Sequence, residues 1–189
     1  MHPRRFLLKP FPGEGYPAGV TIGGSIGRHA DTMSVRCEVR GDLSKVSIPA
    51  AAEAPRRQDR LWEETCIELF LGTADSEAYW ELNLSPSGHW NAYRFTRYRE
   101  GMRGEPAITS LPYDLRRDPE ALLLTAEFGI GKIVPAEADL AATVAVVIKT
   151  LDGGKSHWAQ IHPASRPDFH RRDGFALILP SSSRSTEAR

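Results

Sequence analysis

Apolar and polar residues alternate over short runs along most of the chain, as in strands that bury one face. The first runs lie at 19–23, 34–40 and 45–48, each bounded by Gly, Asp or Pro. Similar runs follow at 66–71, 79–85, 89–96, 121–128, 142–150, 157–161 and 174–179. Two segments, 118–121 and 135–140, could form a helical turn, but neither is long enough to carry a fold.

This pattern predicts an all-β protein, an antiparallel β-sandwich of jelly-roll or immunoglobulin-like type with about nine or ten strands and minimal helix. A closed β-barrel is the alternative. The chain has 189 residues, which suits one domain, and we place that domain at 1–180. The last residues, 181–189, are polar and are expected to form a disordered tail.

Two neighbouring runs show clearly which side chains share a face. In 79–84 one face carries Trp80, Leu82 and Leu84, and the other carries Tyr79, Glu81 and Asn83. In 89–95 the two sets are Trp90, Ala92 and Arg94, and Asn91, Tyr93 and Phe95. Because successive side chains of a strand point to opposite sides, one face can build the core while the other meets a ligand.

Charge and hydropathy argue against two classes of partner. Lys and Arg together number 24, as do Asp and Glu, so the formal net charge is zero. Such a chain has no global field to attract nucleic acid or an anionic membrane. No run approaches the roughly 18 consecutive apolar residues of a membrane span. We expect a soluble protein without nucleic-acid or membrane partners, and the sequence leaves its oligomeric state open.

The first ten residues and the number of cysteines indicate in which cellular compartment the protein is expected. Residues 1–10 contain only Phe-Leu-Leu between charged residues and prolines, which is shorter than the roughly 7–15 apolar residues of a signal peptide. Cys37 and Cys66 are the two cysteines, too few for a disulfide framework. We therefore expect a cytoplasmic protein with free, buried thiols, although a bridge is conceivable if the two strands pair.

Tryptophans and charged residues within the strand runs are the candidates for ligand binding. Trp62 lies where a loop enters a strand and Trp158 follows a turn, so either could offer a flat face to a sugar ring or belong to the core. Trp80 and Trp90 are expected in the core. Glu68 and Arg94 interrupt apolar runs; they could pair with each other or bind ligand hydroxyls. Asn83 could add an amide that both donates and accepts.

The segment 157–173 concentrates histidines and aspartates. Its spacing matches no tight metal-ligand motif, so we expect Asp168 and His170 to form local hydrogen bonds and Phe169 to anchor the loop. The sequence contains no phosphate-binding glycine loop and no His-Glu-x-x-His pair. A glycosidase pair could in principle come from Glu63, Glu64, Glu68 and Glu81, whose separation the sequence leaves open. We predict no catalytic and no metal-binding residues.

Three groups of residues carry a resemblance to a known family. The first is Arg57, Asp59, Leu61, Trp62, Thr65, Cys66, Glu68 and Phe70. The second is Tyr79, Trp80, Glu81, Asn83, the turn Ser85-Pro86-Ser87-Gly88, Trp90, Tyr93, Arg94 and Phe95, and the third is His162-Pro163 with Pro167-Asp168-Phe169-His170. Over most of residues 18–179 the chain thereby resembles the DOMON-like domains related to type 9 carbohydrate-binding modules, which are β-sandwiches.

The resemblance implies a non-catalytic domain that binds a small sugar or sugar end. In sugar-binding members two tryptophans enclose a terminal sugar and charged side chains bind its hydroxyls; the similar positions here are Trp62, Glu68, Arg94 and Trp158. We expect no cofactor. Related domains bind haem through Met and His, so a haem- or metal-binding domain using Met33 or Met102 with His162 or His170 is one alternative. A glycoside-acting enzyme is the other.

Overall fold

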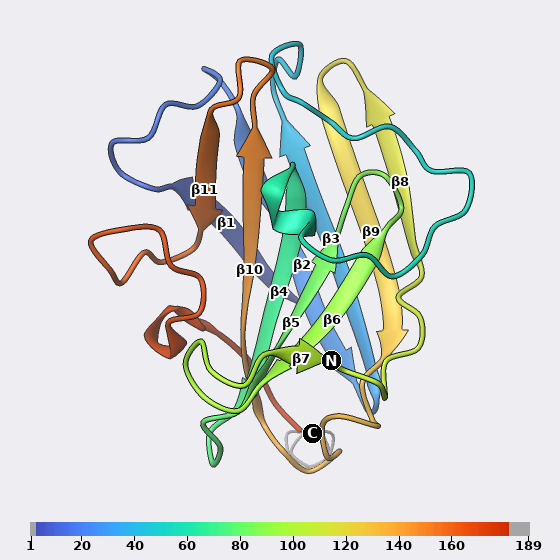
Figure 1. Cartoon of the computed structure of the whole chain (residues 1–189). Helices are drawn as coiled ribbons and strands as arrows, with labels where there is room; N and C mark the ends of the chain where they lie inside the picture. The colour runs from blue at the N-terminus through green and yellow to red at the C-terminus, as the bar shows by residue number, and fades with distance from the viewer. Residues whose placement is uncertain (1–2, 182–189) are drawn as a thin grey trace.

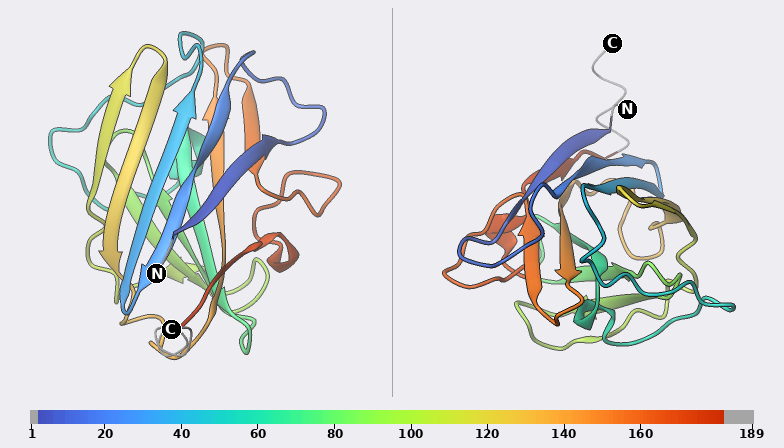
Figure 2. Two further views of the ribbon diagram at one scale, coloured as in Figure 1. Left: turned by 180° about the vertical axis from the view of Figure 1, so that it is seen from behind. Right: turned by 90° about the horizontal axis from the view of Figure 1, so that it is seen from above.

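Two antiparallel sheets face each other and enclose the main core in the computed structural model of the chain, which describes residues 3–181 (Figures 1 and 2). The back sheet has the order β1 (Arg4–Pro10), β2 (Thr21–His29), β3 (Thr32–Arg40), β9 (Ala121–Gly129) and β8 (Tyr113–Asp118). The front sheet, nearest the viewer in Figure 1, has the order β7 (Arg103–Gly104), β6 (Trp90–Phe95), β5 (Tyr79–Leu84), β4 (Cys66–Thr73), β10 (Leu140–Lys149) and β11 (Lys155–Ala159). A short strand, β12 (Leu177–Leu179), pairs with the start of β10.

Strand β1 belongs to both sheets. Its residues Arg4–Leu8 pair with β2, whereas Lys9 and Pro10 pair with β11. The two layers are therefore joined along one side of the sandwich by continuous strand pairing, as the view from above in Figure 2 shows. The predicted antiparallel β-sandwich with minimal helix is confirmed.

The main core fills the space between the sheets and contains the faces that alternation assigned to it. Trp80, Leu82 and Leu84 of β5 and Trp90 and Ala92 of β6 are all buried there. The back sheet contributes residues such as Ile22, Val35 and Leu124. The division of β5 and β6 into a core face and an opposite face is thus confirmed.

Several element boundaries differ from the prediction. Strands β1, β7 and β8 were not expected, because β1 and β8 carry mostly exposed and charged residues that mask their alternation. The predicted strand at 45–48 is wrong, since Val46 forms only an isolated bridge with Thr150. The segments 118–121 and 135–140 contain turns, and the helices among residues 3–181 are two single 3-10 turns, Leu61–Glu63 and Arg172–Gly174.

Both cysteines and the last described residue, Ser181, are buried. Cys37 on β3 and Cys66 on β4 are buried and free, and they belong to different sheets, so the conceivable bridge between paired strands does not form. Ser181 is buried and its N–H donates to Asp139 Oδ1 over 2.8 Å, so the ordered domain includes the first residue of the predicted tail. The rest of that tail, 182–189, lies outside the described residues. Within the described part of the chain, no helix has the length and apolar character to cross a membrane.

Candidate functional site

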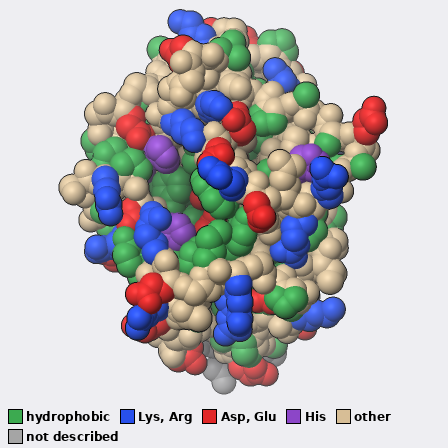
Figure 3. Space-filling view, viewed as in Figure 1, with side chains coloured by type: hydrophobic (Ala, Val, Ile, Leu, Met, Phe, Trp, Pro, Cys, Tyr) green, Lys and Arg blue, Asp and Glu red, His purple; other side chains and the backbone are tan. Residues whose placement is uncertain are grey.

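The outer face of the front sheet, which points away from the main core, carries a second cluster of buried side chains. Its members are Phe70, Tyr79, Tyr93, Phe95, Ala145 and Phe175. Two loops, 96–102 and 160–176, lie over this face, and a cavity of about 320 Å³ opens between them and the strands. It is lined by Trp62, Glu68, Glu81, Phe95, Arg99, Met102, Val147, His157, Pro167, Asp168, Phe169 and His170. Figure 3 shows histidine and hydrophobic side chains gathered around a hollow on this face.

Glu68 lies in the cavity wall and is only 4% exposed. Its neighbour across the strands is Asn83 of β5, which is completely buried. One oxygen of each side chain, Glu68 Oε1 and Asn83 Oδ1, has no hydrogen-bond partner among residues 3–181. Burial, together with the nearby charge of Glu81, raises the pKa of Glu68 well above its ordinary value. The described part of the protein therefore leaves two buried hydrogen-bond acceptors, one on Glu68 and one on Asn83, without a donor.

Glu81 is the second carboxyl group of the cavity and is also 4% exposed. Its Oε1 accepts a hydrogen bond of 2.8 Å from Asn83 Nδ2, and its Oε2 lies 3.8 Å from His170 Nε2. Burial raises the pKa of Glu81 to about 7, against smaller opposing effects of Asn83 and Arg99. Two neighbouring buried carboxyl groups thus resist simultaneous ionisation near neutral pH.

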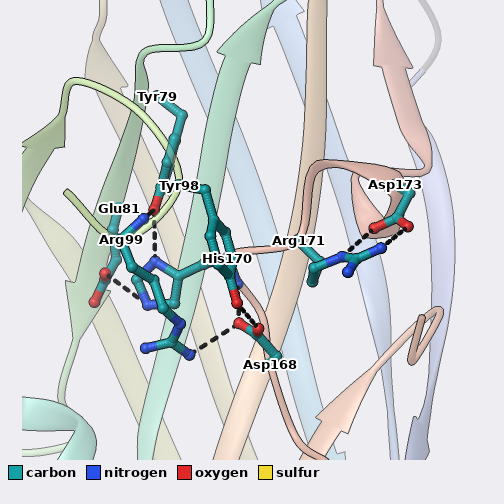
Figure 4. Close-up of polar contacts among 8 residues, drawn as sticks. All are labelled: Tyr79, Glu81, Tyr98, Arg99, Asp168, His170, Arg171 and Asp173. Atoms are coloured by element: carbon teal, nitrogen blue, oxygen red, sulfur yellow. Dashed lines mark hydrogen bonds and ion pairs between the residues drawn. The ribbon is translucent and has the colours of Figure 1, made fainter. Parts of the chain in front are cut away.

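His170 connects the loop to the strand behind it (Figure 4). Its Nδ1 lies 2.8 Å from the hydroxyl of Tyr79, and that hydroxyl also accepts the backbone N–H of Arg99 over 3.1 Å. Burial, followed by the charge of Arg99, lowers the pKa of His170 to about 4. The imidazole is therefore neutral at physiological pH and gives Glu81 no compensating charge.

Asp168 fastens the two loops to each other. Its carboxylate accepts hydrogen bonds from the Tyr98 hydroxyl, from Arg99 Nη2 over 2.8 Å and from the N–H of His170 over 3.1 Å. Burial alone would raise the pKa of Asp168, but the bonds from Tyr98 and Arg99 outweigh it and hold the pKa below its ordinary value. Arg171 pairs with Asp173 apart from this group, as Figure 4 shows.

A close approach at Gly72 holds the 160–176 loop against β4. Arg172 reaches over this residue and donates to the carbonyls of Thr73 over 2.7 Å and Ala78 over 3.2 Å. A Cβ on Gly72 would lie 2.0 Å from Arg172 Nη1, so a larger residue here would displace the guanidinium from its present position. The predicted anchor Phe169 packs against the outer cluster and lines the cavity.

Trp62 forms an aromatic wall of the cavity. Its indole is partly exposed and contacts Tyr93 edge to face at 5.7 Å between ring centroids. The preceding loop is bonded to β6, since Tyr93 donates to Asp59 Oδ1 over 2.8 Å and Arg57 Nη1 donates to Asn91 Oδ1 over 2.9 Å. The fold therefore fixes the loop that carries Trp62.

The structure brings together three of the five predicted ligand residues. Trp62 and Glu68 both line the cavity, and Asn83 lies beside Glu68. Whether they bind a ligand stays a prediction. The salt bridge between Glu68 and Arg94, one of the two alternatives for these residues, does not form, because Arg94 is the strand partner of Trp80 and shares its face of the sheet. That face is opposite to the one that carries Glu68.

Of the two alternatives for Trp158, a wall of the sugar site or a core residue, the structure supports the core. Trp158 is 2% exposed in the main core, where its strand partner Val146 is also buried. Its indole N–H donates to Ser156 Oγ over 3.0 Å. The intervening residue, His157, points the other way, lines the cavity and bonds through Nδ1 to Glu14 Oε1 over 2.8 Å.

Arg99, His157 and Met102 are cavity residues that the sequence did not single out as part of the sugar site. Asp168 and His170 were expected to bond locally, and they do, but the Tyr98, Arg99 and Tyr79 partners lie about 70 or more residues earlier. Strand parity places His157 on the face opposite to Ser156 and Trp158, but it does not tell which face of the strand meets the cavity. No local sequence signal places the 96–102 loop on the cavity.

The residues considered as haem or metal ligands lie in different parts of the structure. Met33 is completely buried in the main core and is unsuited to bind a ligand, whereas Met102 and His170 both line the cavity. A haem ligand at His170 would have to replace its contact with Tyr79. Among the described residues, no group of three or more His, Cys, Asp and Glu side chains is placed to hold a metal ion.

Comparison with known proteins identifies similar folds. No protein-family model and no curated protein matches the chain. A Bacteroides uniformis protein to which carbohydrate binding has been ascribed superposes with a TM-score of 0.62 at 13% identity, over 92% of this chain and 85% of that one. A family 9 carbohydrate-binding module of Caldicellulosiruptor kristjanssonii in complex with cellotriose gives 0.56 at 11% identity, over 99% and 86%. A complex of such a module from the same organism with glucose gives 0.54 at 10%, over 88% and 79%. The chain therefore has a fold similar to that of family 9 carbohydrate-binding modules.

Proposed function

We propose that the chain is a non-catalytic domain that binds a single sugar, or the end of a sugar chain, in the cavity of the front sheet. The observation that carries this proposal is the combination of the Trp62 face with the buried, incompletely bonded carboxyl group of Glu68 in one cavity. A flat apolar ring suits the C–H face of a sugar, and a carboxyl group accepts from its hydroxyls. Three solved structures of similar fold, two of them with bound glucose or cellotriose, support it.

The size of the cavity limits the ligand. Its volume of about 320 Å³ is at the lower end of the roughly 300–1,000 Å³ typical of small-molecule sites. One sugar ring is thus the expected occupant, with any further residues of a chain outside. Trp62 would form the stacking wall, and Glu68, Glu81 and Arg99 would supply hydrogen bonds.

Two of the four glutamates considered for a glycosidase pair, Glu63 and Glu64, lie outside the cavity. Glu63 pairs with Arg60 and Glu64 with Lys149, and neither lines the cavity, so these two supply no catalytic pair there. We expect oligosaccharides incubated with the protein to be recovered unchanged. Chromatography of the mixture measures this directly, and release of shorter sugars that is lost in Glu68→Gln would establish a hydrolase instead.

The experiment for binding is a titration of mono- and oligosaccharides followed by tryptophan fluorescence and by calorimetry. We expect a saturable response that is lost in Trp62→Ala. The matched control is Tyr16→Ala, which removes a partly exposed aromatic ring outside the cavity. Absence of any response across the sugars, or an unchanged response in Trp62→Ala, would overturn the proposal.

A further inference from the structure

More carboxyl groups than Lys or Arg side chains line the cavity. Three carboxyl groups, from Glu68, Glu81 and Asp168, face one guanidinium, that of Arg99. Arg99 Nη2 is bonded to Asp168 at 2.8 Å, so this pair compensates itself. Glu68 and Glu81 remain without an ion pair to Lys or Arg in the part of the chain that the structure describes.

The remaining charged groups near the two glutamates do not replace such a partner. His170 Nε2 is 3.8 Å from Glu81 Oε2, but burial lowers the pKa of His170 to about 4, so its imidazole is neutral at physiological pH. Lys155 on β11 is exposed and acts on Glu68 only through its charge. His157, on the same strand, is bonded to Glu14. A cation brought by the ligand would therefore complete the site.

The walls of the cavity suit a cation as well. Trp62, Phe95 and Phe169 line it, and the face of an aromatic ring attracts an ammonium group, most strongly where water is excluded. Glu68 lines the cavity and is only 4% exposed, so its carboxyl group meets an occupant of the cavity rather than bulk water, while its Oε1 is buried without a partner among residues 3–181. Aromatic walls around two unpaired carboxyl groups are the chemistry that recognises an amine.

We propose that the sugar bound in this cavity is an amino sugar with a free ammonium group, which lies between Glu68 and Glu81. This inference rests on the proposed function and adds the substrate class. Beside a neutral sugar, burial keeps at least one of the two carboxyl groups protonated, whereas an ammonium group donates three hydrogen bonds and stabilises the ionised form of both. An N-acetylated sugar loses both advantages because its amide is neutral.

The test compares sugars that differ only at the amine. Calorimetry at pH 7 would use glucose, galactose and mannose, each with its 2-amino and 2-acetamido derivative. A charge-assisted hydrogen bond in a buried site predicts that at least one amino sugar binds about tenfold or more tightly than its hydroxyl counterpart. The acetamido derivative should show no such gain.

Variants then locate the effect. Glu68→Gln keeps the shape and removes the charge, so the preference for the amino sugar should fall to about onefold. Glu63→Gln removes an exposed carboxylate next to Trp62 in the sequence, outside the cavity, and should leave the preference unchanged. If Glu68→Gln does not fold, Glu81→Gln takes its place, and the sugar series on wild-type protein decides in either case.

The outcomes separate the two proposals. Equal affinity for amino and hydroxyl sugars, or a preference that persists in Glu68→Gln, would overturn the amino-sugar inference while leaving carbohydrate binding in place. If no sugar of any kind binds, the proposed function itself fails. Tight binding of the amino sugar alone supports both.

Discussion

Glu68 and Asn83 are direct partners across β4 and β5, and each keeps one buried side-chain oxygen without a hydrogen bond among residues 3–181. A buried acceptor left unsatisfied costs about 1–3 kcal/mol. The fold tolerates this at two adjacent positions of one face, beside a cavity with aromatic walls. Under the proposed function a ligand in the cavity would supply a donor to the carboxyl group of Glu68, which lines the cavity, whereas Asn83 does not line it.

The carboxyl pair predicts a characteristic dependence of stability on pH. Glu81 has a folded-state pKa of about 7, raised above its ordinary 4.5. The stabilising effect of a raised carboxyl pKa is complete below 4.5 and is lost as the pH rises through 7. Wild type therefore loses stability between pH 5 and pH 8 and Glu81→Gln does not. The free energy of unfolding of the variant relative to wild type should rise over this range by an amount on the order of 2–3 kcal/mol, at about 1.4 kcal/mol per pKa unit.

Chemical denaturation of ligand-free protein at several pH values measures this difference. Glu63→Gln is the control, because its pKa is lowered by Arg60 and its removal should not stabilise at pH 8. A constant difference between Glu81→Gln and wild type from pH 5 to pH 8 would contradict the raised pKa.

Trp158 should matter for stability and not for binding. Removal of a large core side chain costs about 3–5 kcal/mol when it is cut back to alanine, so the milder Trp158→Phe should lower the melting temperature by several degrees and still fold. Its sugar affinity should remain that of wild type, because Trp158 lies on the core face of β11. Calorimetric melting and titration of the same sample measure both; reduced affinity at unchanged stability would place Trp158 in the site.

Asp168 is expected to hold the cavity together. Asp168→Asn weakens the bonds from Tyr98 and Arg99, and bonds to charged groups contribute about 1.5–3 kcal/mol each. We expect a lower melting temperature and weaker ligand affinity. Asp173→Asn breaks an exposed pair with Arg171 in the same loop and should change little. Equal behaviour of the two variants would exclude the role given to Asp168.

The cysteines should be inert in the folded protein. Both thiols are buried, and burial raises the pKa of Cys37 to about 12 and that of Cys66 well above its ordinary value. A thiol-reactive dye should therefore label neither residue within hours, and both should react at once in denaturant. Fast labelling of one thiol in native buffer would show that its strand opens locally.

The sequence predicted the fold class and part of the site for a clear reason. Alternation is strict in β5 and β6, so the separation of Trp80 from Glu81 and of Trp90 from Asn91 follows from a period of two. The same rule placed Arg94 with Trp90, on the core face, although its charge suggested a ligand role. At Arg94, strand alternation predicted the position of the side chain better than its charge did.

The rest of the site depends on contacts distant in sequence. Asp168 meets Arg99 and His170 meets Tyr79 only because two loops fold over the front sheet, and no periodicity encodes that meeting. Alternation also does not tell which face of β11 is buried. Either Trp158 or His157 could have faced the core, and the pairing of Trp158 with the buried Val146 shows that it is Trp158. The strands β1 and β8 were missed because their exposed charges hide the pattern.

The bonds from Arg57 and Asp59 to β6 have a consequence for the thermodynamics of recognition. They immobilise the segment before Trp62 in the free protein, so its loop does not have to be ordered when a ligand arrives. Immobilising a side chain on association costs about 0.5–1.5 kcal/mol, and here folding has already removed much of that freedom. A modest contact area can then yield useful affinity, and cutting these tethers should weaken binding through entropy while every ligand contact stays intact.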